Sequence, residues 1–230
     1  MLWRHYSAAR ICTGEAAKIL AVALALSLLT SSTSAVAESP IVPISVLKTA
    51  NFRGETASPD AHRMADWIVA SNDNHGMPFL IVDKVAAKTF LFDDHSHIVG
   101  STPVLLGLGH GDNSVPGIGH RRLATITTEE RTTAAGRFEA SLGQDFEQDV
   151  LWIDYDAGLS LHRVITGNPK DHRRARLLSP TTLDNRITYG CINVPVLFYD
   201  KMIVPTFSGT VGIVYIMPET KPLESVFSIH

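Results

Sequence analysis

One cysteine outside the first dozen residues, Cys191, lies in the stretch ITYGCINVP. A thiol becomes a nucleophile when its surroundings lower its pKa, and the unpaired N–H groups at a helix N-terminus have this effect. Asn193 is a residue type that caps helices and Pro195 is tolerated in a first turn, so we expect a helix to begin just after Cys191. Free cysteines are also often small buried hydrophobes, and this alternative stays open.

The neighbours of this cysteine suit nucleophilic chemistry. Gly190 provides either a positive φ angle or room for a substrate backbone, and the N–H groups of Gly190 and Cys191 can together face an oxyanion. A thiolate needs a base, and His162 is the best candidate because the alternating segment LSLHRVIT would hold it on a strand. A histidine in such a segment is also often a satisfied sheet residue.

The other histidines carry weaker signals. His95 and His97 form an H-x-H pair that would put both rings on one face of a strand, as a metal site requires. The pair falls in an expected hairpin turn without a third ligand nearby, so we expect neither a metal nor another cofactor. His110 and His120 flank a glycine-rich loop, where they are either solvated loop residues or substrate contacts.

The first 37 residues resemble an export signal. They contain a basic start, an apolar run from Ile19 to Leu29, and the small-residue site Ala35-Val36-Ala37. The apolar run is shorter than the roughly 20 residues that a membrane-spanning helix needs. We therefore expect a signal peptide over residues 1–37, cleaved after Ala37, and export to the periplasm or cell envelope. An uncleaved anchor is the alternative.

Removal of this signal leaves 193 residues (230 − 37), which suits one well-buried domain. The formal net charge then changes from −3 to −5, because three basic residues and one acidic residue are removed. A mildly acidic chain lacks the basic surface typical of nucleic-acid binding, so we expect no nucleic-acid partner. We also expect the protein to be a monomer. Cys12 leaves with the signal, so Cys191 has no disulfide partner and must be buried or used in an oxidising compartment.

The elements that must position the cysteine and the histidine are mostly strands. Residues 38–77 are expected to form an extended lead-in and a short helix that starts at Ser58-Pro59-Asp60. Residues 78–218 lack a βαβ rhythm, which predicts a mostly β sandwich or barrel with a few short helices, one of them PVLFYDKMIV, followed by a tail over residues 219–230. The expected strands are FLIVDK, KTFLFDD, HIVGSTPVLLGLG, LATITT, AAGRFEASLG, VLWIDYD, LSLHRVIT and TVGIVYIMP.

The segment from Thr188 to Asn193, TYGCIN, resembles the signature of the L,D-transpeptidase (YkuD-like) catalytic domain. That signature runs Ser/Thr-His-Gly-Cys-hydrophobic-Asn or Arg, and five of six positions agree. His162 matches the upstream histidine of the family, and TTAAGRF resembles the family's Thr-Pro-x-Gly-x-Phe turn. The similarity covers roughly residues 78–217, and the cysteine motif is its specific part.

This resemblance implies a transferase of cell wall biogenesis and cell shape, acting on peptidoglycan stem peptides. Cys191 would attack the carbonyl of the diamino acid, usually meso-diaminopimelate, in a tetrapeptide stem, and terminal D-alanine would leave. A second stem, a lipoprotein lysine or a D-amino acid would then accept the acyl group. His162 would act as base and then acid, oriented by a backbone carbonyl, because Arg163 at the next position offers no side-chain oxygen. The expected oxyanion or substrate contacts are Gly190, Tyr189, Arg186, Asn193 and Thr188.

Tyr189 departs from the family pattern, which has histidine at this position. A phenol can donate a hydrogen bond to an oxyanion or a stem carbonyl, but it cannot act as a base near neutral pH. Tyr189 thus leaves open a non-catalytic domain that binds peptidoglycan. Separate alternatives are an L,D-carboxypeptidase, or a cysteine peptidase of another family, in which water is the acceptor.

The second departure is an insert of twenty-eight residues between His162 and Cys191, which is longer than is common in the family. It contains Arg173, Arg174 and Arg176, for which two roles are open. The insert is either a solvated basic helix or a lid whose arginines bind carboxylates of the stem. Arg186, closer to the cysteine, is either a carboxylate contact or part of a structural salt bridge.

Overall fold

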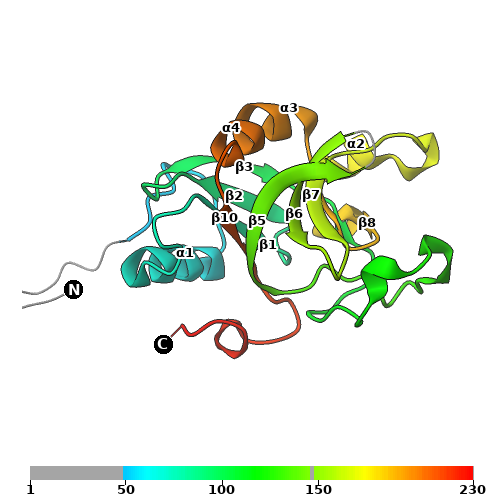
Figure 1. Cartoon of the computed structure of the whole chain (residues 1–230), viewed down its shortest axis with the longest axis horizontal. Coiled ribbons are helices and arrows are strands. Elements are labelled where there is room, and N and C mark those ends of the chain that lie inside the picture. The colour runs from blue at the N-terminus through cyan, green and yellow to red at the C-terminus, as the bar shows by residue number, and fades with distance from the viewer. Residues whose placement is uncertain (1–48, 146–147, 230) are drawn as a thin grey trace, which may run out of the picture. The chain divides into compact units, whose positions relative to one another are not determined.

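The computed structural model describes residues 49–145 and 148–229 (Figure 1). The expected signal segment, residues 1–37, and residues 38–48 of the lead-in lie outside these described residues. Of the helices in the described part of the chain, none has the length and apolar character needed to cross a membrane.

The described residues form a mostly β fold, as the sequence predicts. Eight strands make one sheet in the order β3-β2-β1-β10-β5-β6-β7-β9, and β4 (Leu106–Gly107) pairs separately with β8 (Arg186–Thr188). The strands of the large sheet are β1 (Phe79–Asp83), β2 (Lys88–Phe92), β3 (Ile98–Pro103), β5 (Gly136–Asp145), β6 (Gln148–Asp154), β7 (Leu159–Arg163), β9 (Ile192–Val194) and β10 (Gly212–Ile216).

The large sheet curves until its two edges nearly meet. β3 and β9 are the edge strands, yet the backbone of Leu105, just after β3, exchanges two hydrogen bonds of 2.9 Å with Asn193 in β9. The result is a nearly closed barrel. Strand β9, which directly follows Cys191, is therefore bonded on both sides, to β7 and to the segment at Leu105.

Helix α1 (Pro59–Ser71) covers one face of the sheet and follows local signals in the sequence. The Ser58 side chain caps it by accepting a hydrogen bond of 3.0 Å from the N–H of Ala61, and Asn72 ends it in the left-handed conformation with φ 55°. Its buried face packs with Phe79 and the C-terminal segment in one apolar cluster. In Figure 1 the C-terminal segment runs beside α1.

The opposite face of the sheet is covered by a second helical segment, drawn in orange in Figure 1. Leu80 and Val82 of β1 point to this side, whereas Phe79 and Ile81 point to α1. Each face of β1 thus has an apolar partner, which explains why all five of its residues are buried. The segment consists of α3 (Val196–Phe198), a π-helical turn (Tyr199–Ile203) and α4 (Val204–Phe207).

The expectation of a strand at LATITT is wrong. Leu123–Thr125 forms a 3-10 turn, closed by a hydrogen bond of 3.1 Å from the N–H of Ile126 to the carbonyl of Leu123. Arg121 fastens this loop by donating to Glu130 and to the carbonyl of Thr125. β-branched residues favour a strand where a neighbour can pack on them, and this exposed loop pairs with no strand of the described residues.

The other short helices lie in loops. The insert between β7 and β8 contains α2 (Arg173–Leu177) and two 3-10 turns, and the glycine-rich loop ends in another. The 3-10 turns outside Leu123–Thr125 are Ile118–His120, Pro169–Asp171, Thr182–Asn185 and Leu223–Ser225.

Candidate active site

The histidine singled out in the sequence lies in β7, and the cysteine directly precedes β9, the parallel neighbour of β7. β7 pairs with β9 in a register that places Leu161 beside Ile192 and His162 beside Asn193. Leu161 and Ile192 are fully buried in the core. Because side chains alternate along a strand, His162 and Asn193 project to the opposite face, together with Cys191 at the start of β9.

Cys191 does not lie at a helix N-terminus, so that expectation is wrong. The residues after it form strand β9, and the helix begins later, at Val196, with Pro195 as its cap residue. Asn193 lies within the strand and is almost fully buried, so its side chain does not cap the helix. Pairing with β7 has overridden the local capping signal of Asn193 and Pro195.

The imidazole of His162 is oriented by the backbone next to it. Its Nδ1 lies 2.8 Å from the carbonyl oxygen of Arg163, which is a contact of the kind expected from the sequence. The Arg163 side chain is anchored in turn, because its guanidinium donates to Asp149 at 2.9 Å and to Asp200 at 2.7 Å. A carbonyl can only accept, so Nδ1 carries the proton and Nε2 is left as the basic nitrogen.

The surroundings of Cys191 favour its thiolate. Burial acts to raise the pKa of the thiol, but the neighbouring His162 and Ser160 outweigh this effect and lower the pKa below its usual value. Burial likewise acts to lower the pKa of His162, and the contacts with Cys191 and the Arg163 carbonyl raise it instead. Opposite shifts of this kind are typical of a thiol–imidazole pair.

Two further groups contact the sulfur. The Ser160 hydroxyl lies 3.6 Å from Sγ and donates to it, and Sγ lies 3.4 Å from the carbonyl oxygen of Gly158. Ser160 is almost fully buried on β7. Sequence reasoning missed Ser160, although its position two residues before His162 places both side chains on the same face of the strand.

The turn that carries Cys191 requires glycine at position 190. Gly190 has φ 133°, and a Cβ atom there would lie 2.9 Å from the carbonyl oxygen of Thr132. The carbonyl of Gly190 accepts a hydrogen bond of 2.7 Å from the buried hydroxyl of Thr133. The close approach of Gly190 to Thr132 and Thr133 thus fixes the position of the turn that carries Cys191.

Thr188 closes the same turn from within. Its hydroxyl donates to the carbonyl of Cys191 at 2.7 Å and accepts from the N–H of Gly190 at 3.2 Å. The Gly190 N–H therefore donates to Thr188 in this structure, whereas from the sequence we expected it to face an oxyanion. Thr188 itself holds the backbone of the turn in shape.

Tyr189 lies at the outer side of the turn beneath an arginine that the sequence did not single out. The guanidinium carbon of Arg131 lies 4.0 Å from the centre of the Tyr189 ring, within the range of a cation–π interaction. The Nε of Arg131 is buried without a hydrogen-bond partner among the described residues. A small cleft lined by Tyr189, Gly190, Gly158 and Ile118 opens beside this pair.

Arg186 forms a structural salt bridge, which is one of the two roles expected for it. Its buried guanidinium pairs with Glu219 and donates to the carbonyl of Lys84 at 3.0 Å. Lys84 is fully buried and pairs with Asp112 at 2.8 Å. His110 contacts the same Glu219 from the exposed side of the glycine-rich loop. This cluster fastens that loop to the barrel.

The three arginines of the insert differ in what they contact. Arg173 donates to the Oδ1 of Asn193 at 3.0 Å and to Asp171 at 3.0 Å, so it connects the insert to the site. Arg176 donates to the carbonyl of Asp171 at 2.8 Å and to the carbonyl of Asp184 at 2.9 Å. Arg174 is exposed and lines an apolar cavity between α2 and α3. The contact of Arg173 spans twenty residues and could not be found from local sequence.

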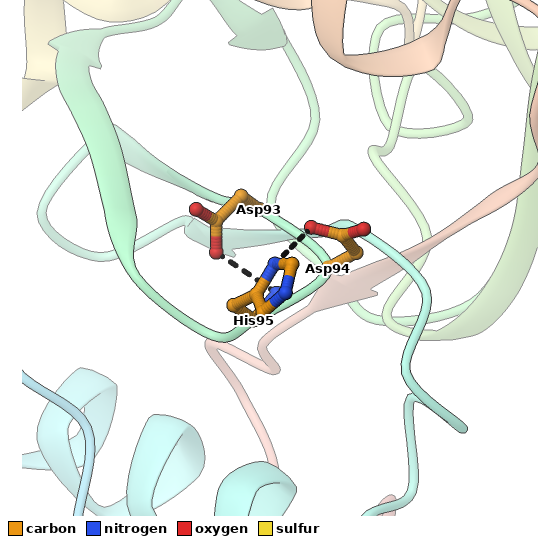
Figure 2. Close-up of side chains that lie close together, drawn as sticks. All are labelled: Asp93, Asp94 and His95. Carbon is orange, nitrogen blue, oxygen red and sulfur yellow. Dashed lines mark hydrogen bonds and ion pairs between the residues drawn. The ribbon is translucent and has the colours of Figure 1, made fainter.

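The hairpin turn after β2 gathers Asp93, Asp94 and His95 (Figure 2). The carboxylate of Asp93 accepts hydrogen bonds of 3.0 and 2.7 Å from the N–H groups of His95 and His97, and Asp94 contacts the His95 ring at 2.7 Å. These contacts are those of a capped turn in solvent. The possible ligand atoms of the three residues lie within 4.8 Å of one another, in a group separate from Cys191.

Comparisons with known proteins yield similarities of fold only. No protein-family model and no curated protein matches the chain. The catalytic domain of an L,D-transpeptidase from E. faecium is 16% identical, with a TM-score of 0.36 over 61% of this chain and 96% of that chain. The helical cell shape determining protein Pgp2 from Campylobacter jejuni is 12% identical, with a TM-score of 0.41 over 72% of this chain and 58% of that chain.

Proposed function

We propose that the protein is an L,D-transpeptidase, a cysteine acyltransferase that acts on peptidoglycan stem peptides. The observation that carries the proposal is the arrangement of Cys191, His162 and the Arg163 carbonyl. The nearby His162 lowers the pKa of the half-buried Cys191 thiol, and Nδ1 of that imidazole is oriented by a backbone oxygen at 2.8 Å. The TYGCIN segment supplies the substrate class, through its resemblance to the family signature.

The first half-reaction forms a thioester. Nε2 of His162 takes the proton of the Cys191 thiol, and the sulfur attacks the carbonyl of the diamino acid at the third position of a tetrapeptide stem. The bond from this carbonyl to the D-alanine nitrogen breaks, and the imidazolium gives its proton to the leaving amine. The Arg163 carbonyl holds the imidazole throughout, because it accepts from the Nδ1–H in both protonation states.

The second half-reaction breaks the thioester. An acceptor amine attacks the acyl carbon, His162 removes the amine proton, and the Cys191 sulfur leaves and regains a proton. A second stem, a lipoprotein lysine or a D-amino acid supplies this amine. Water in its place would give an L,D-carboxypeptidase, and the thiol–imidazole pair is competent for either acceptor.

Tyr189 takes the place of the family's motif histidine as a donor and not as a base. Tyr189 is 36% exposed and lines the small cleft beside Gly190, and in this proposal its hydroxyl donates to a substrate carbonyl. Arg131 covers the ring and keeps it in position. In this proposal the base is His162, and activity does not depend on an imidazole at position 189.

The proposal includes export. The basic start, apolar run and Ala35-Val36-Ala37 site of the first 37 residues support cleavage after Ala37 and function in the periplasm or cell envelope, where peptidoglycan lies. N-terminal sequencing of the protein recovered from the envelope fraction tests this point. A sequence starting at Glu38 supports it, and an intact Met1 contradicts it.

Incubation of the purified protein with a disaccharide-tetrapeptide, followed by mass spectrometry of the products, tests the reaction. A cross-linked dimer together with released D-alanine is the expected outcome. Release of D-alanine without a dimer would indicate a carboxypeptidase. An unchanged muropeptide, with retained binding of the protein to sacculi, would indicate a non-catalytic binding domain.

Two variants identify the residues responsible. Cys191→Ala and His162→Ala should each abolish product formation, because the first removes the nucleophile and the second removes its base. His97→Ala is the matched control, since its ring lies in the exposed hairpin turn away from Cys191. Undiminished product formation by either of the first two variants would refute the assignment of that residue.

A further inference from the structure

A continuous chain of hydrogen bonds connects the insert to the imidazole. Arg173 Nη1 lies 3.0 Å from Oδ1 of Asn193, and Nδ2 of Asn193 lies 3.1 Å from Nε2 of His162. On the other side of the ring, Nδ1 lies 2.8 Å from the carbonyl oxygen of Arg163. Asn193 is almost fully buried, so these contacts are shielded from water.

The direction of every bond in this chain follows from the donors and acceptors available. A guanidinium has only donors, so the oxygen of the Asn193 amide must face Arg173. The amide nitrogen then faces His162, and it too is a donor only. Nε2 must therefore accept, which requires the neutral imidazole with its proton on Nδ1.

This arrangement disfavours the imidazolium form of His162. A protonated Nε2 would point its N–H at the N–H groups of Asn193. Rotation of the Asn193 amide would relieve that conflict, because its oxygen would then accept from Nε2. The same rotation would turn the amide nitrogen toward the donors of Arg173, so Arg173 opposes it.

The other charged and titratable groups near His162 act in known directions. Cys191, at the start of β9, favours the charged imidazole, and so does Asp145 at the end of β5. Arg163, on the same strand, is paired with Asp149 of β6 and with Asp200 of the second helical segment. From the insert, Arg173 is paired with Asp171. Arg173 is thus the group that opposes the contribution of Cys191 through the amide of Asn193.

We propose that Arg173 is a positioning residue that sets the protonation of the catalytic pair. While it holds the Asn193 oxygen, Nε2 of His162 is occupied as an acceptor, and this network disfavours transfer of the Cys191 proton to the ring. When Arg173 withdraws, the Asn193 amide turns, its oxygen accepts from Nε2–H, and the proton moves from sulfur to imidazole. The position of the insert therefore controls the reactivity of the thiol. This role rests on the proposed function, in which the thiolate is the nucleophile.

Alkylation of Cys191 by iodoacetamide as a function of pH measures the thiolate without any turnover. Cys191→Ala provides the background from other sites. For Arg173→Met we expect the rate near neutral pH to rise roughly three- to tenfold, which is the scale of one hydrogen bond. The plateau rate at high pH should stay unchanged, because there the thiolate forms in both proteins. Arg173→Lys keeps a donor and should lie nearer the wild type.

Arg174→Met is the matched control, because it removes the neighbouring guanidinium from α2 and should leave the profile unchanged. Asn193→Ala should raise the rate as Arg173→Met does, and the double variant should equal Asn193→Ala alone, because both act through one amide. If Asn193→Ala does not fold, the alkylation profiles of Arg173→Met and Arg173→Lys still test the proposal. An Arg173→Met profile equal to the wild type, or moved to higher pH, would overturn the proposal.

The tautomer provides a second readout. Long-range ¹H–¹⁵N correlation spectra of the His162 ring should show the proton on Nδ1 in the wild-type protein near neutral pH. In Arg173→Met the ring should show more imidazolium at the same pH. A wild-type ring with its proton on Nε2 would contradict the bond directions given above. Because neither measurement uses a substrate, failure of the proposed reaction would not alter either result.

Discussion

The hydroxyl of Thr133 donates a hydrogen bond of 2.7 Å to the carbonyl of Gly190, the residue before the thiol. The same hydroxyl accepts from the N–H of Gly107 at 2.9 Å, and Thr133 is fully buried. The carbonyl of Thr133 accepts from the buried ammonium of Lys84 at 2.8 Å. Thr133 thus connects the turn that carries Cys191 to both Gly107 and Lys84.

Replacement of this threonine by valine should lower both stability and activity. Thr133→Val keeps the shape but leaves the Gly107 N–H and the Gly190 carbonyl unpaired, at a cost of about 1–3 kcal/mol of unfolding free energy. Displacement of the turn should lower kcat/KM by about 10- to 100-fold. Thr89→Val is the matched control, because Thr89 is equally buried and bonds to the carbonyl of Ile81 away from the site. Equal loss of activity in both variants would contradict the positioning role.

Gly190→Ala should displace the thiol directly. The new Cβ would meet the Thr132 carbonyl at 2.9 Å, and alanine is strained at φ 133°, which costs about 1–3 kcal/mol. We expect loss of product formation and a lower denaturant midpoint. Gly209→Ala tests strain alone, since Gly209 has φ 72° and open space around its Cβ position. That variant should lose some stability and keep full activity; an active Gly190→Ala protein would refute the close approach.

Ser160→Ala should make the thiol less reactive near neutral pH. The Ser160 hydroxyl donates to the sulfur and helps to lower the pKa of Cys191, so its loss should raise that pKa. Iodoacetamide alkylation near neutral pH should slow by about threefold, with an unchanged plateau at high pH. Ser208→Ala, on the exposed end of α4, should leave the rate unchanged. A faster reaction in Ser160→Ala would contradict the donor role.

The buried pair of Lys84 and Asp112 should make the fold sensitive to acid. Hydrogen bonds from Lys84 and Thr220 overcome the effect of burial and lower the pKa of Asp112 in the folded protein. A lowered carboxyl pKa stabilises the fold above the unfolded value of about 4, and this stability is lost as pH falls below it. Asp112→Asn should cost about 1–3 kcal/mol at neutral pH, because it removes the nearer of the two carboxylates that pair with the buried Lys84 and leaves Glu219 at 3.5 Å.

The measurement is the free energy of unfolding as a function of pH. The curve of Asp112→Asn should be flatter on the acid side, and its difference from the wild type should narrow progressively as pH falls below about 4. Asp60→Asn on α1 is the control, since its partner Arg63 is exposed and surface pairs contribute about 0–1 kcal/mol. Parallel acid limbs for Asp112→Asn and the wild type would contradict the assignment.

Local patterns in the sequence predicted the elements that depend on local interactions. The helix capped by Ser58 and the alternating strand around His162 follow from spacing alone, and the mostly β fold follows from the many short apolar segments. The strand expected at LATITT is wrong because β propensity has no effect without a partner strand. The helix expected at Cys191 is wrong because parallel pairing of β9 with β7 outweighs a local cap signal.

The contacts that complete the site join residues far apart in the chain. Arg173 reaches Asn193 across twenty residues, Thr133 reaches Gly190 across fifty-seven, and Lys84 reaches Asp112 across twenty-eight. Each depends on how the loops fold over the barrel, and a single sequence contains no local signal for such pairs. Cys191 and His162 could be proposed as nucleophile and base from residue type and family resemblance, but the contacts around them required the structure.

The most direct test of the proposed activity is to trap the acyl-enzyme. The protein is mixed with a disaccharide-tetrapeptide, quenched with acid and examined by intact-mass and peptide mass spectrometry. We predict an adduct with the mass of the muropeptide less D-alanine, located on the peptide that contains Cys191 and missing from Cys191→Ala. Release of D-alanine by the Cys191→Ala protein, or an adduct on another residue, would contradict the assignment of Cys191 as the nucleophile.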